Sequence, residues 1–251
     1  MCPAQTDAMP TSKPTLWAGA SGYAYDIWKG SFYPEKIAAD AMLAWYAARL
    51  PTVEINNTFY RLPKAAVLEQ WAAATPERFR FAIKASRRIT HDARLKADEA
   101  ADAVGFLYRN LAALGDKRGP VLFQLPPFLK RDVPRLREFL ALLPEGHRAA
   151  FEFRHESWLD EEVYAQLREA GAALCLSERE DALPPPLAET APWGYLRLRL
   201  ENYTEPDLAK WAQRIAACAW QEAHVYFMHE PTAPGYAKTL SELYAGGSSA
   251  A

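Results

Sequence analysis

The sequence lacks a strong excess of charge of either sign. Its 251 residues include 29 Lys and Arg against 31 Asp and Glu, which gives a formal net charge of −2. A protein whose main partner is nucleic acid usually carries a large basic excess, so the balance makes nucleic acid an unlikely partner. A local basic site remains compatible with these numbers.

Cysteine is also scarce. Cys2, Cys175 and Cys218 are widely spaced and form no CxxC pair, which predicts free thiols in a reducing cytoplasm. The segment ALCLS predicts that Cys175 is a buried strand residue, and a nucleophilic thiol is the less favoured alternative.

Long apolar segments are missing as well. No run approaches the roughly 20 apolar residues that a membrane span needs. Residues 1–15 are polar, contain three prolines and have no apolar stretch typical of a signal peptide. We therefore expect a cytoplasmic protein with a disordered N-terminal arm over residues 1–15 and a flexible tail over residues 245–251.

Several motifs of catalysis and cofactor binding are absent. GxGxxG, P-loop, kinase and GxSxG patterns do not occur, which disfavours dinucleotide binding, nucleotide kinases and hydrolase triads. HxH and HExxH spacings are missing too, so no metal site and no cofactor are predicted. A divalent metal held by His229, Glu230, Glu54 and Glu152 stays open as a minor alternative.

The sequence does contain regularly alternating strand and helix patterns. Strands are expected at Leu16–Tyr23, from Val53, and at Arg78–Ser86, Gly119–Pro127, Ala149–Arg154, Ala173–Glu178, Gly194–Leu200 and Ala223–Glu230. Helices are expected at Asp40–Arg49, Lys64–Ala74, Ala97–Leu114, Val133–Leu143, Asp160–Gly171, Glu205–Cys218 and Ala237–Tyr244. A proline-rich loop at Pro184–Pro186 replaces one helix. This order predicts a parallel sheet.

Polar residues on one face of several strands favour a closed sheet over an open one. In VEINNTFYRLP, Val53 and Ile55 alternate with Glu54 and Asn56, whereas strands of an open, doubly wound sheet are apolar on both faces. We therefore predict an α/β fold, a single (β/α)8 TIM-barrel-like domain over residues 16–244, with a polar lumen.

Active sites of such barrels lie at the carboxyl ends of the strands. The residues that the alternation and adjacent loops place there are Ser21, Tyr23, Glu54, Asn56, Tyr60, Lys84, His91, Gln124, Glu152, Arg154, His155, Trp158, Ser177, Arg197, Arg199, His229 and Glu230. Polar side chains from so many strands are hard to explain as a solvated face. They predict a site.

Most of these residues also have a structural interpretation. Glu54 is either catalytic or a partner of Lys84 or Arg154, because a charge in a lumen must be paired. Glu152 and Arg154 form either a salt-bridged layer or a ligand-binding pair. Gln124 suits a hydrogen-bond clamp, and His155 a loop cap. His91 faces either solvent or the site. The aromatic side chains either pack at the rim or form a platform for a planar or sugar-like ligand; they are Trp28, Phe59, Tyr60 and Trp158.

Positive groups outnumber carboxylates among the deep candidates. Lys84, Arg154, Arg197 and Arg199 stand against Glu54 and Glu152, and arginine suits phosphate and carboxylate groups. The pattern predicts a small anionic substrate. Glu54 and Glu152 would then be the general acid and base, with pKa values separated by unequal cationic neighbours.

Six motifs in order resemble the YecE-like family, known as domain of unknown function 72. They are GASGYAYDIWKGSFYP, TVEINNTFYRLP, FRFAIKAS followed by ITH, GPVLFQLPP, FEFRHESW and YLRLR, within a resemblance that runs from about Leu16 to Tyr244. The resemblance implies a TIM-barrel-like fold in a bacterial cytoplasmic protein of unestablished activity. It carries the family's motif positions to Glu54, Asn56, Thr58, Tyr60, Arg61, Lys84, His91, Gln124, Glu152, Arg154, His155, Trp158 and Arg197.

The last strand departs from the family pattern. Members typically show a segment similar to YFNN there, whereas this chain has YFMHE, so His229 and Glu230 replace paired amides. This difference is consistent with an altered substrate preference or lost activity.

Three functions follow as hypotheses. The first is an enzyme, such as a hydrolase, lyase or isomerase, that acts on a small anionic substrate, phosphorylated or sugar-like, with Glu54 and Glu152 as acid and base. Lys84, Arg154 and Arg197 would hold the anion, and Asn56, Tyr60 and Gln124 would orient it. The second is a non-catalytic binding or sensor module. The third, metal-dependent nucleic-acid processing, is disfavoured by the balanced charge.

Overall fold

Eight strands form the centre of the molecule in the computed structural model, which describes residues 13–178 and 187–247. The strands are β1 (Thr15–Ser21), β2 (Thr52–Ile55), β3 (Arg80–Lys84), β4 (Arg118–Gln124), β5 (Ala149–Glu152), β6 (Ala173–Ser177), β7 (Trp193–Leu198) and β8 (Glu222–Phe227). Each is short and rich in residues that favour extended backbone.

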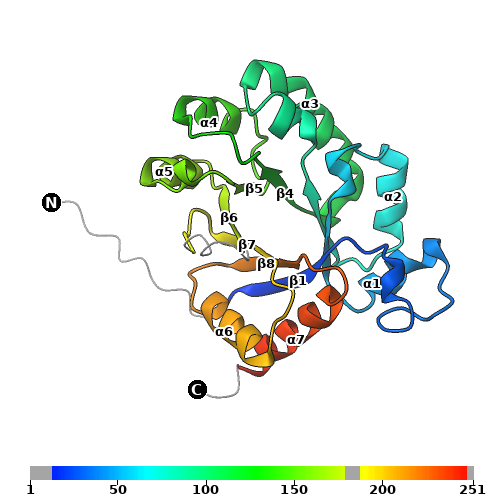
Figure 1. Cartoon of the computed structure of the whole chain (residues 1–251). Helices are drawn as coiled ribbons and strands as arrows, with labels where there is room; N and C mark the ends of the chain where they lie inside the picture. The colour runs from blue at the N-terminus through cyan, green and yellow to red at the C-terminus, as the bar shows by residue number, and fades with distance from the viewer. Residues whose placement is uncertain (1–12, 179–186, 248–251) are drawn as a thin grey trace.

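These strands pair in chain order and in parallel, and β8 closes on β1. Figure 1 shows the helices surrounding the strands, with α2 and α3 beyond one side of the barrel and α6 and α7 beyond the opposite side. The predicted (β/α)8 barrel is confirmed.

Seven α-helices in the described residues follow the strands. They are α1 (Met42–Ala47), α2 (Ala65–Ala73), α3 (Ala97–Leu111), α4 (Val133–Leu140), α5 (Glu161–Glu169), α6 (Glu205–Ala216) and α7 (Ala233–Gly246). Side chains of Asp132, Asp160 and Thr204 accept backbone N–H groups at the starts of α4, α5 and α6. Such caps satisfy donors that the first turn leaves free.

Among the helix starts, those of α7 and α1 differ most from the predicted limits. Helix α7 begins at Ala233, four residues before the expected Ala237, because Pro234 fits the first turn, where no backbone donor is needed. Asp40 does not cap α1; it lies in a short 3-10 turn (Ala39–Ala41) that precedes the helix. Strand β1 begins at Thr15 and α7 ends at Gly246, so each extends slightly beyond the predicted domain of residues 16–244.

Some predictions lie wholly or partly outside the described residues. These are the N-terminal arm up to residue 12, the loop with Pro184–Pro186 and the tail from residue 248. Within the described part of the chain, no helix combines the length and the apolar character that a bilayer span requires.

Apolar residues form two regions on either side of the barrel wall. Outward-facing side chains such as Val53, Phe81 and Phe123 pack with the helices. Inward-facing side chains, including Ala82, Leu122 and Tyr226, fill the middle of the lumen. The lumen is therefore a packed core whose charged groups lie towards its two ends.

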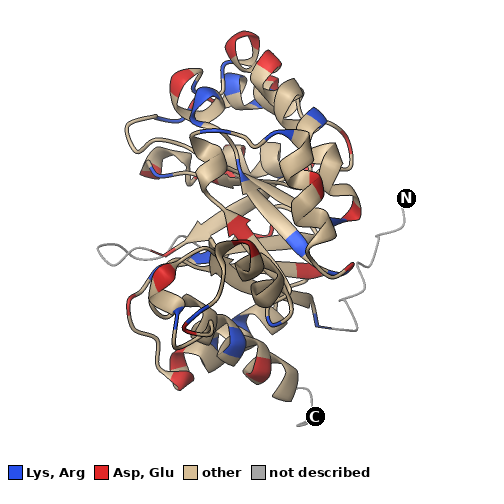
Figure 2. Ribbon diagram, turned by 90° about the vertical axis from the view of Figure 1, so that its right-hand side faces the viewer, with Lys and Arg blue, Asp and Glu red and all other residues tan. Residues whose placement is uncertain are grey.

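Figure 2 shows acidic and basic residues interspersed along the helices around the barrel.

Candidate active site at the carboxyl end of the barrel

Glu54, at the carboxyl end of β2, is fully buried. Its Oε1 accepts a hydrogen bond from Arg197 Nη2 at 2.9 Å and another from the Asn56 amide at 3.0 Å, while its Oε2 accepts one from the Tyr195 hydroxyl at 2.7 Å. Burial raises the pKa of Glu54, but Arg197, Tyr195 and Asn56 outweigh it and the net shift is downward. The carboxyl group is held ionised.

Glu152, at the end of β5, is held in the same way. Arg197 Nη1 donates to its Oε2 at 2.5 Å, and Arg199 Nη2 lies 3.6 Å from its Oε1. Against the effect of burial, these two cations and the Gln124 side chain lower the pKa of Glu152 to about 2. One arginine therefore bridges two carboxylates that arrive from different strands.

Arg197 is the centre of this network and is 1% exposed. Both of its Nη atoms are occupied by carboxylates, and its pKa is raised because Glu54 and Glu152 outweigh burial. Its Nε has no hydrogen-bond partner among the described residues. Arg197 is thus committed to Glu54 and Glu152, and its available hydrogen-bonding capacity for a ligand is small.

Lys84 ends β3 at the same end of the barrel and is only partly buried. Its ammonium lies 4.5 Å from the centre of the Phe59 ring. Desolvation together with Arg197 and Arg199 lowers its pKa to about 8, even though Glu54 and Glu152 act in the opposite sense. The sequence-based alternative of a Glu54–Lys84 ion pair is not what the geometry shows, since Glu54 pairs with Arg197.

His91 contacts the same aromatic ring. Its imidazole meets Phe59 edge to face with centroids 4.9 Å apart, and its Nδ1 lies 2.9 Å from the Thr90 hydroxyl. Burial, Lys84, Arg87 and Arg154 lower the pKa of His91, with Asp92 opposing them. His91 is therefore a half-buried neutral imidazole beside Lys84 and Arg154.

Arg154 follows β5 and is exposed. Its strand ends at Glu152, so Arg154 does not continue the buried face and forms no ion pair with Glu152 or with any other described residue. The predicted Glu152–Arg154 layer is replaced by Glu152–Arg197. Tyr60 is also exposed, at 78%, and stands edge to face against Phe59.

Other predicted residues support the loops. Asn56 also hydrogen-bonds Ser21, which ties the ends of β1 and β2 together. Gln124 is buried next to Glu152 in the β4–β5 register. Thr58 donates either to the carbonyl of Ile55 at 2.9 Å or to that of Lys84 at 2.8 Å, which fixes the loop that carries Phe59.

Trp158 and His155 lie apart from this group. Trp158 is 0% exposed, stacks on Phe153 and donates its indole N–H to the Leu129 carbonyl at 2.7 Å. It has no free surface for a ligand, because the chain turns outward after β5. His155 accepts the Ser157 N–H and caps a short turn, as its structural interpretation predicts.

The minor metal alternative receives no geometric support. In residues 13–178 and 187–247, no three His, Cys, Asp or Glu side chains are grouped so that they could hold a metal ion. His229 instead lies 3.2 Å from the Thr232 hydroxyl and 4.0 Å from Glu201.

Tyr195 is the site residue that the sequence analysis missed. It donates to Glu54 and stands two positions before Arg197 on β7. Extending the alternation of Arg197 and Arg199 backwards by one step would have identified it.

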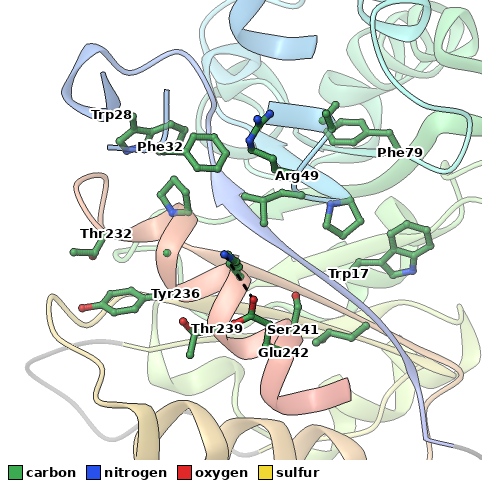
Figure 3. A pocket seen from close by; sticks show the side chains of 18 of the residues that line it. Trp17, Trp28, Phe32, Arg49, Phe79, Thr232, Tyr236, Thr239, Ser241 and Glu242 are labelled. Atoms are coloured by element: carbon green, nitrogen blue, oxygen red, sulfur yellow. Dashed lines mark ion pairs between the residues drawn. The ribbon is translucent and has the colours of Figure 1, made fainter. Parts of the chain in front are cut away.

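A groove of about 1260 Å³ lies outside the barrel, between α1 and α7 along β1. Figure 3 shows Trp28, Phe32, Arg49 and Phe79 on one side and Thr232, Tyr236, Thr239 and Glu242 on the other. Its polar groups include an exposed Lys238–Glu242 pair at 3.8 Å. Of the predicted ligand-contacting residues, only Trp28, an alternative aromatic platform, lines it.

Solved structures of other proteins share this fold. A DUF72 family protein of Thermotoga maritima superposes with a TM-score of 0.76 at 23% identity, over 92% of this chain and 99% of that one. A DUF72 family protein of Enterococcus faecalis gives a TM-score of 0.76 at 18% identity, over 92% and 96% of the two chains.

Curated relatives match parts of the sequence. UPF0759 protein YunF of Bacillus subtilis is 32% identical over 152 residues, 54% of this chain and 50% of the relative. UPF0759 protein YecE of Escherichia coli K12 is 35% identical over 111 residues, 44% and 40% of the two chains. The chain thus spans half or less of the curated relatives it matches. A family model described as "Protein of unknown function DUF72" matches residues 17–250, and the chain belongs to the DUF72 family.

Proposed function

We propose that this protein binds a small anionic molecule, such as a phosphorylated or carboxylated metabolite, at the carboxyl end of its barrel. The observation that carries the proposal is an excess of positive charge without carboxylate partners. Glu54 and Glu152 are both taken by Arg197, whereas Lys84 and Arg154 form no ion pair among the described residues. Arg199 makes only a longer carboxylate contact, at 3.6 Å from Glu152, and its Nε donates to the Ser177 hydroxyl at 2.9 Å.

The chemistry of the groups fits an anion. Arg154 offers an exposed guanidinium, whose planar donors match phosphate or carboxylate. The lowered pKa of Lys84 reflects desolvation and the cations Arg197 and Arg199, so the site carries positive charge that an anion would offset. Gln124 and Asn56 lie at this end of the lumen as orienting groups, with Tyr60 at its rim. The anion-holding role predicted for Arg197 passes to Arg199, because both Nη atoms of Arg197 are occupied.

The prediction that Glu54 and Glu152 are the acid/base pair needs revision within this proposal. A general acid must hold a proton near neutral pH, but the lowered pKa of each carboxyl keeps it ionised. Their closed network favours a scaffold that fixes the lumen. The binding or sensor alternative is favoured by that same network, and catalysis would need another group.

Binding of glycerol 3-phosphate, with glycerol as the neutral control, tests the proposal. An anion that binds the folded state should raise the free energy of unfolding by about 2.7 kcal/mol at a hundredfold excess over its dissociation constant. We expect stabilisation by glycerol 3-phosphate and none by glycerol, measured by thermal unfolding and calorimetry with and without Mg²⁺. A wider panel of phosphorylated and carboxylated metabolites extends the same measurement.

The variant Arg154→Ala identifies the site. Arg154 is exposed and makes no ion pair within the described residues, so its removal should weaken anion binding by about tenfold or more while the unliganded protein keeps its stability. Arg168→Ala is the matched control, since Arg168 forms a surface pair with Glu161 on α5. Equal binding by all three proteins, or none by the wild type across the panel, would refute the proposal.

A further inference from the structure

Lys84 differs from the other lysines whose contacts the structure gives. Lys29, Lys96, Lys210 and Lys238 pair with carboxylates, and Lys117 donates to backbone carbonyls of α2 and its C-terminal end. Lys13 lies over the Tyr244 ring and also donates to the Tyr244 carbonyl. Lys84 places its ammonium over the face of Phe59, at the end of β3, and has neither an ion-pair nor a hydrogen-bond partner among the described residues. The charged groups that act on it are Arg197 and Arg199, together with the carboxylates of Glu54 and Glu152, which already pair with Arg197.

We propose that Lys84 is a nucleophilic lysine that forms a Schiff base with a small aldehyde or ketone carrying an anionic group. The inference rests on the proposed anion site, which would bring the carbonyl compound to Lys84. Arg154 and Arg199 would hold the anionic end, leaving the carbonyl carbon for the amine.

The surroundings of Lys84 favour its unprotonated amine, which is the form that attacks a carbonyl group. A lysine becomes a nucleophile when desolvation or a neighbouring cation releases its proton. With its pKa lowered to about 8, Lys84 is a free amine in about a quarter of molecules at pH 7.5, against roughly one in a thousand for an ordinary lysine. Desolvation by burial and the two arginines, Arg197 and Arg199, are the cause of this shift.

The reaction balances without an oxidant or reductant. The lone pair of the Nζ amine attacks the carbonyl carbon, the C=O π pair moves to oxygen, and proton transfer from nitrogen to oxygen gives a carbinolamine. A proton from solvent then converts the hydroxyl into water, and the nitrogen lone pair expels that water to form the C=N bond of a protonated imine. His91, a neutral imidazole on the same Phe59 ring, is available to accept and return the proton.

Reductive trapping tests the proposal with glycolaldehyde phosphate and, as its neutral counterpart, glycolaldehyde. Cyanoborohydride converts the imine into a stable secondary amine, which intact mass and peptide mass spectrometry locate. We expect Lys84 to be labelled about tenfold faster or more than Lys96 at pH 7.5, because its free-amine fraction is much larger. The labelling rate at Lys84 should rise with pH to a midpoint near its pKa of about 8.

Lys84→Arg and Lys96→Arg separate the site from general lysine chemistry. Lys84→Arg keeps the positive charge but removes the amine, so we expect it to lose the fast adduct. Lys96→Arg removes an exposed lysine paired with Glu99 and should keep the fast adduct. A fast adduct that persists in Lys84→Arg would overturn the proposal, as would labelling of Lys84 no faster than Lys96.

Competition distinguishes this inference from the proposed anion site. If inorganic phosphate slows labelling by glycolaldehyde phosphate at Lys84, both stand. Fast labelling by glycolaldehyde and its phosphate alike, unaffected by phosphate, supports the nucleophile and refutes the anion site. Glycerol 3-phosphate binding without fast labelling of Lys84 retains the anion site and overturns the nucleophile.

Discussion

At the scale of single residues, Arg197 has the largest structural consequence. It is the cation that Glu54 and Glu152 share in a nearly dry lumen. Breaking a buried pair by removing one partner is costly because the remaining charge is left uncompensated. Here one substitution would leave two such charges.

We therefore predict that Arg197→Leu lowers the free energy of unfolding by about 3–5 kcal/mol at pH 7. Urea unfolding followed by circular dichroism measures the change. The unpaired carboxyls of the variant would have raised pKa values, so its stability should be lost as the pH rises through those values, and acidification to pH 5 should narrow the difference from wild type. Arg168→Leu, at the surface pair with Glu161, should cost at most about 1 kcal/mol. Similar losses in both variants would contradict the role given to Arg197.

At the scale of elements, the junction of β1 and β2 depends on a glycine. Gly19 lies opposite Thr52 in the register, and a Cβ atom at Gly19 would stand 2.1 Å from the Thr52 carbonyl oxygen. No side chain fits that space without moving one strand. The same strands end in Ser21 and Glu54, which Asn56 joins.

Gly19→Ala should therefore destabilise the protein by about 1–3 kcal/mol or more, since overpacking forces the backbone apart. Thermal unfolding measures this loss, and weaker glycerol 3-phosphate binding would show that the shift reaches the site. Gly235→Ala is the control: it lies in α7 with open space around its Cβ and should be neutral or stabilising by up to about 1 kcal/mol. An unchanged Gly19→Ala protein would disprove the close contact.

The elements also show what the sequence could predict. Period-two alternation placed Glu54, Lys84, Gln124 and Glu152 inside the barrel because it holds as long as a strand stays regular. It did not keep Arg154 on the buried face because β5 ends at Glu152 and the chain turns outward. The sequence also could not show which charged side chains pair with each other inside the lumen. The choice of Arg197 for Glu54 depends on the stagger of the closed barrel, which local patterns do not encode.

At the scale of the whole molecule, buried titratable groups lie at both ends of the lumen. Glu54 and Glu152 are held ionised near the carboxyl end. Towards the other end, His224 is buried against Trp17 and Trp193, with its Nε2 3.7 Å from Glu222. Burial, Arg148 and Arg80 lower the pKa of His224, although Glu222 opposes them. The fold thus favours the unprotonated forms of Glu54 and Glu152 at one end of the lumen and of His224 at the other.

The two ends affect stability in different pH ranges. Glu152 has a folded pKa of about 2 against about 4.3 in an unfolded chain, so its contribution is present above pH 4.3 and is lost as the pH falls towards 2. His224 has a lowered folded pKa, so the unfolded chain binds protons first, and stability falls once the pH drops below about 6.5. Both groups lower the free energy of unfolding as the pH falls. We therefore expect that free energy to decrease in two pH ranges, one below about 6.5 and one below about 4.3.

The upper pH range is the sharper test, because fully buried His224 at the base of the barrel should contribute more to it than half-buried His91. We predict that the free energy of unfolding of the wild type falls between pH 7.5 and 5.5, measured by urea titration at half-unit intervals. His224→Gln removes the titrating group and should flatten that slope, even if the variant is less stable at pH 7.5. His147→Gln, at a partly exposed position, should keep the wild-type slope. A slope that survives in His224→Gln would place the proton uptake elsewhere, with His91, whose pKa is also lowered, as the next position to substitute.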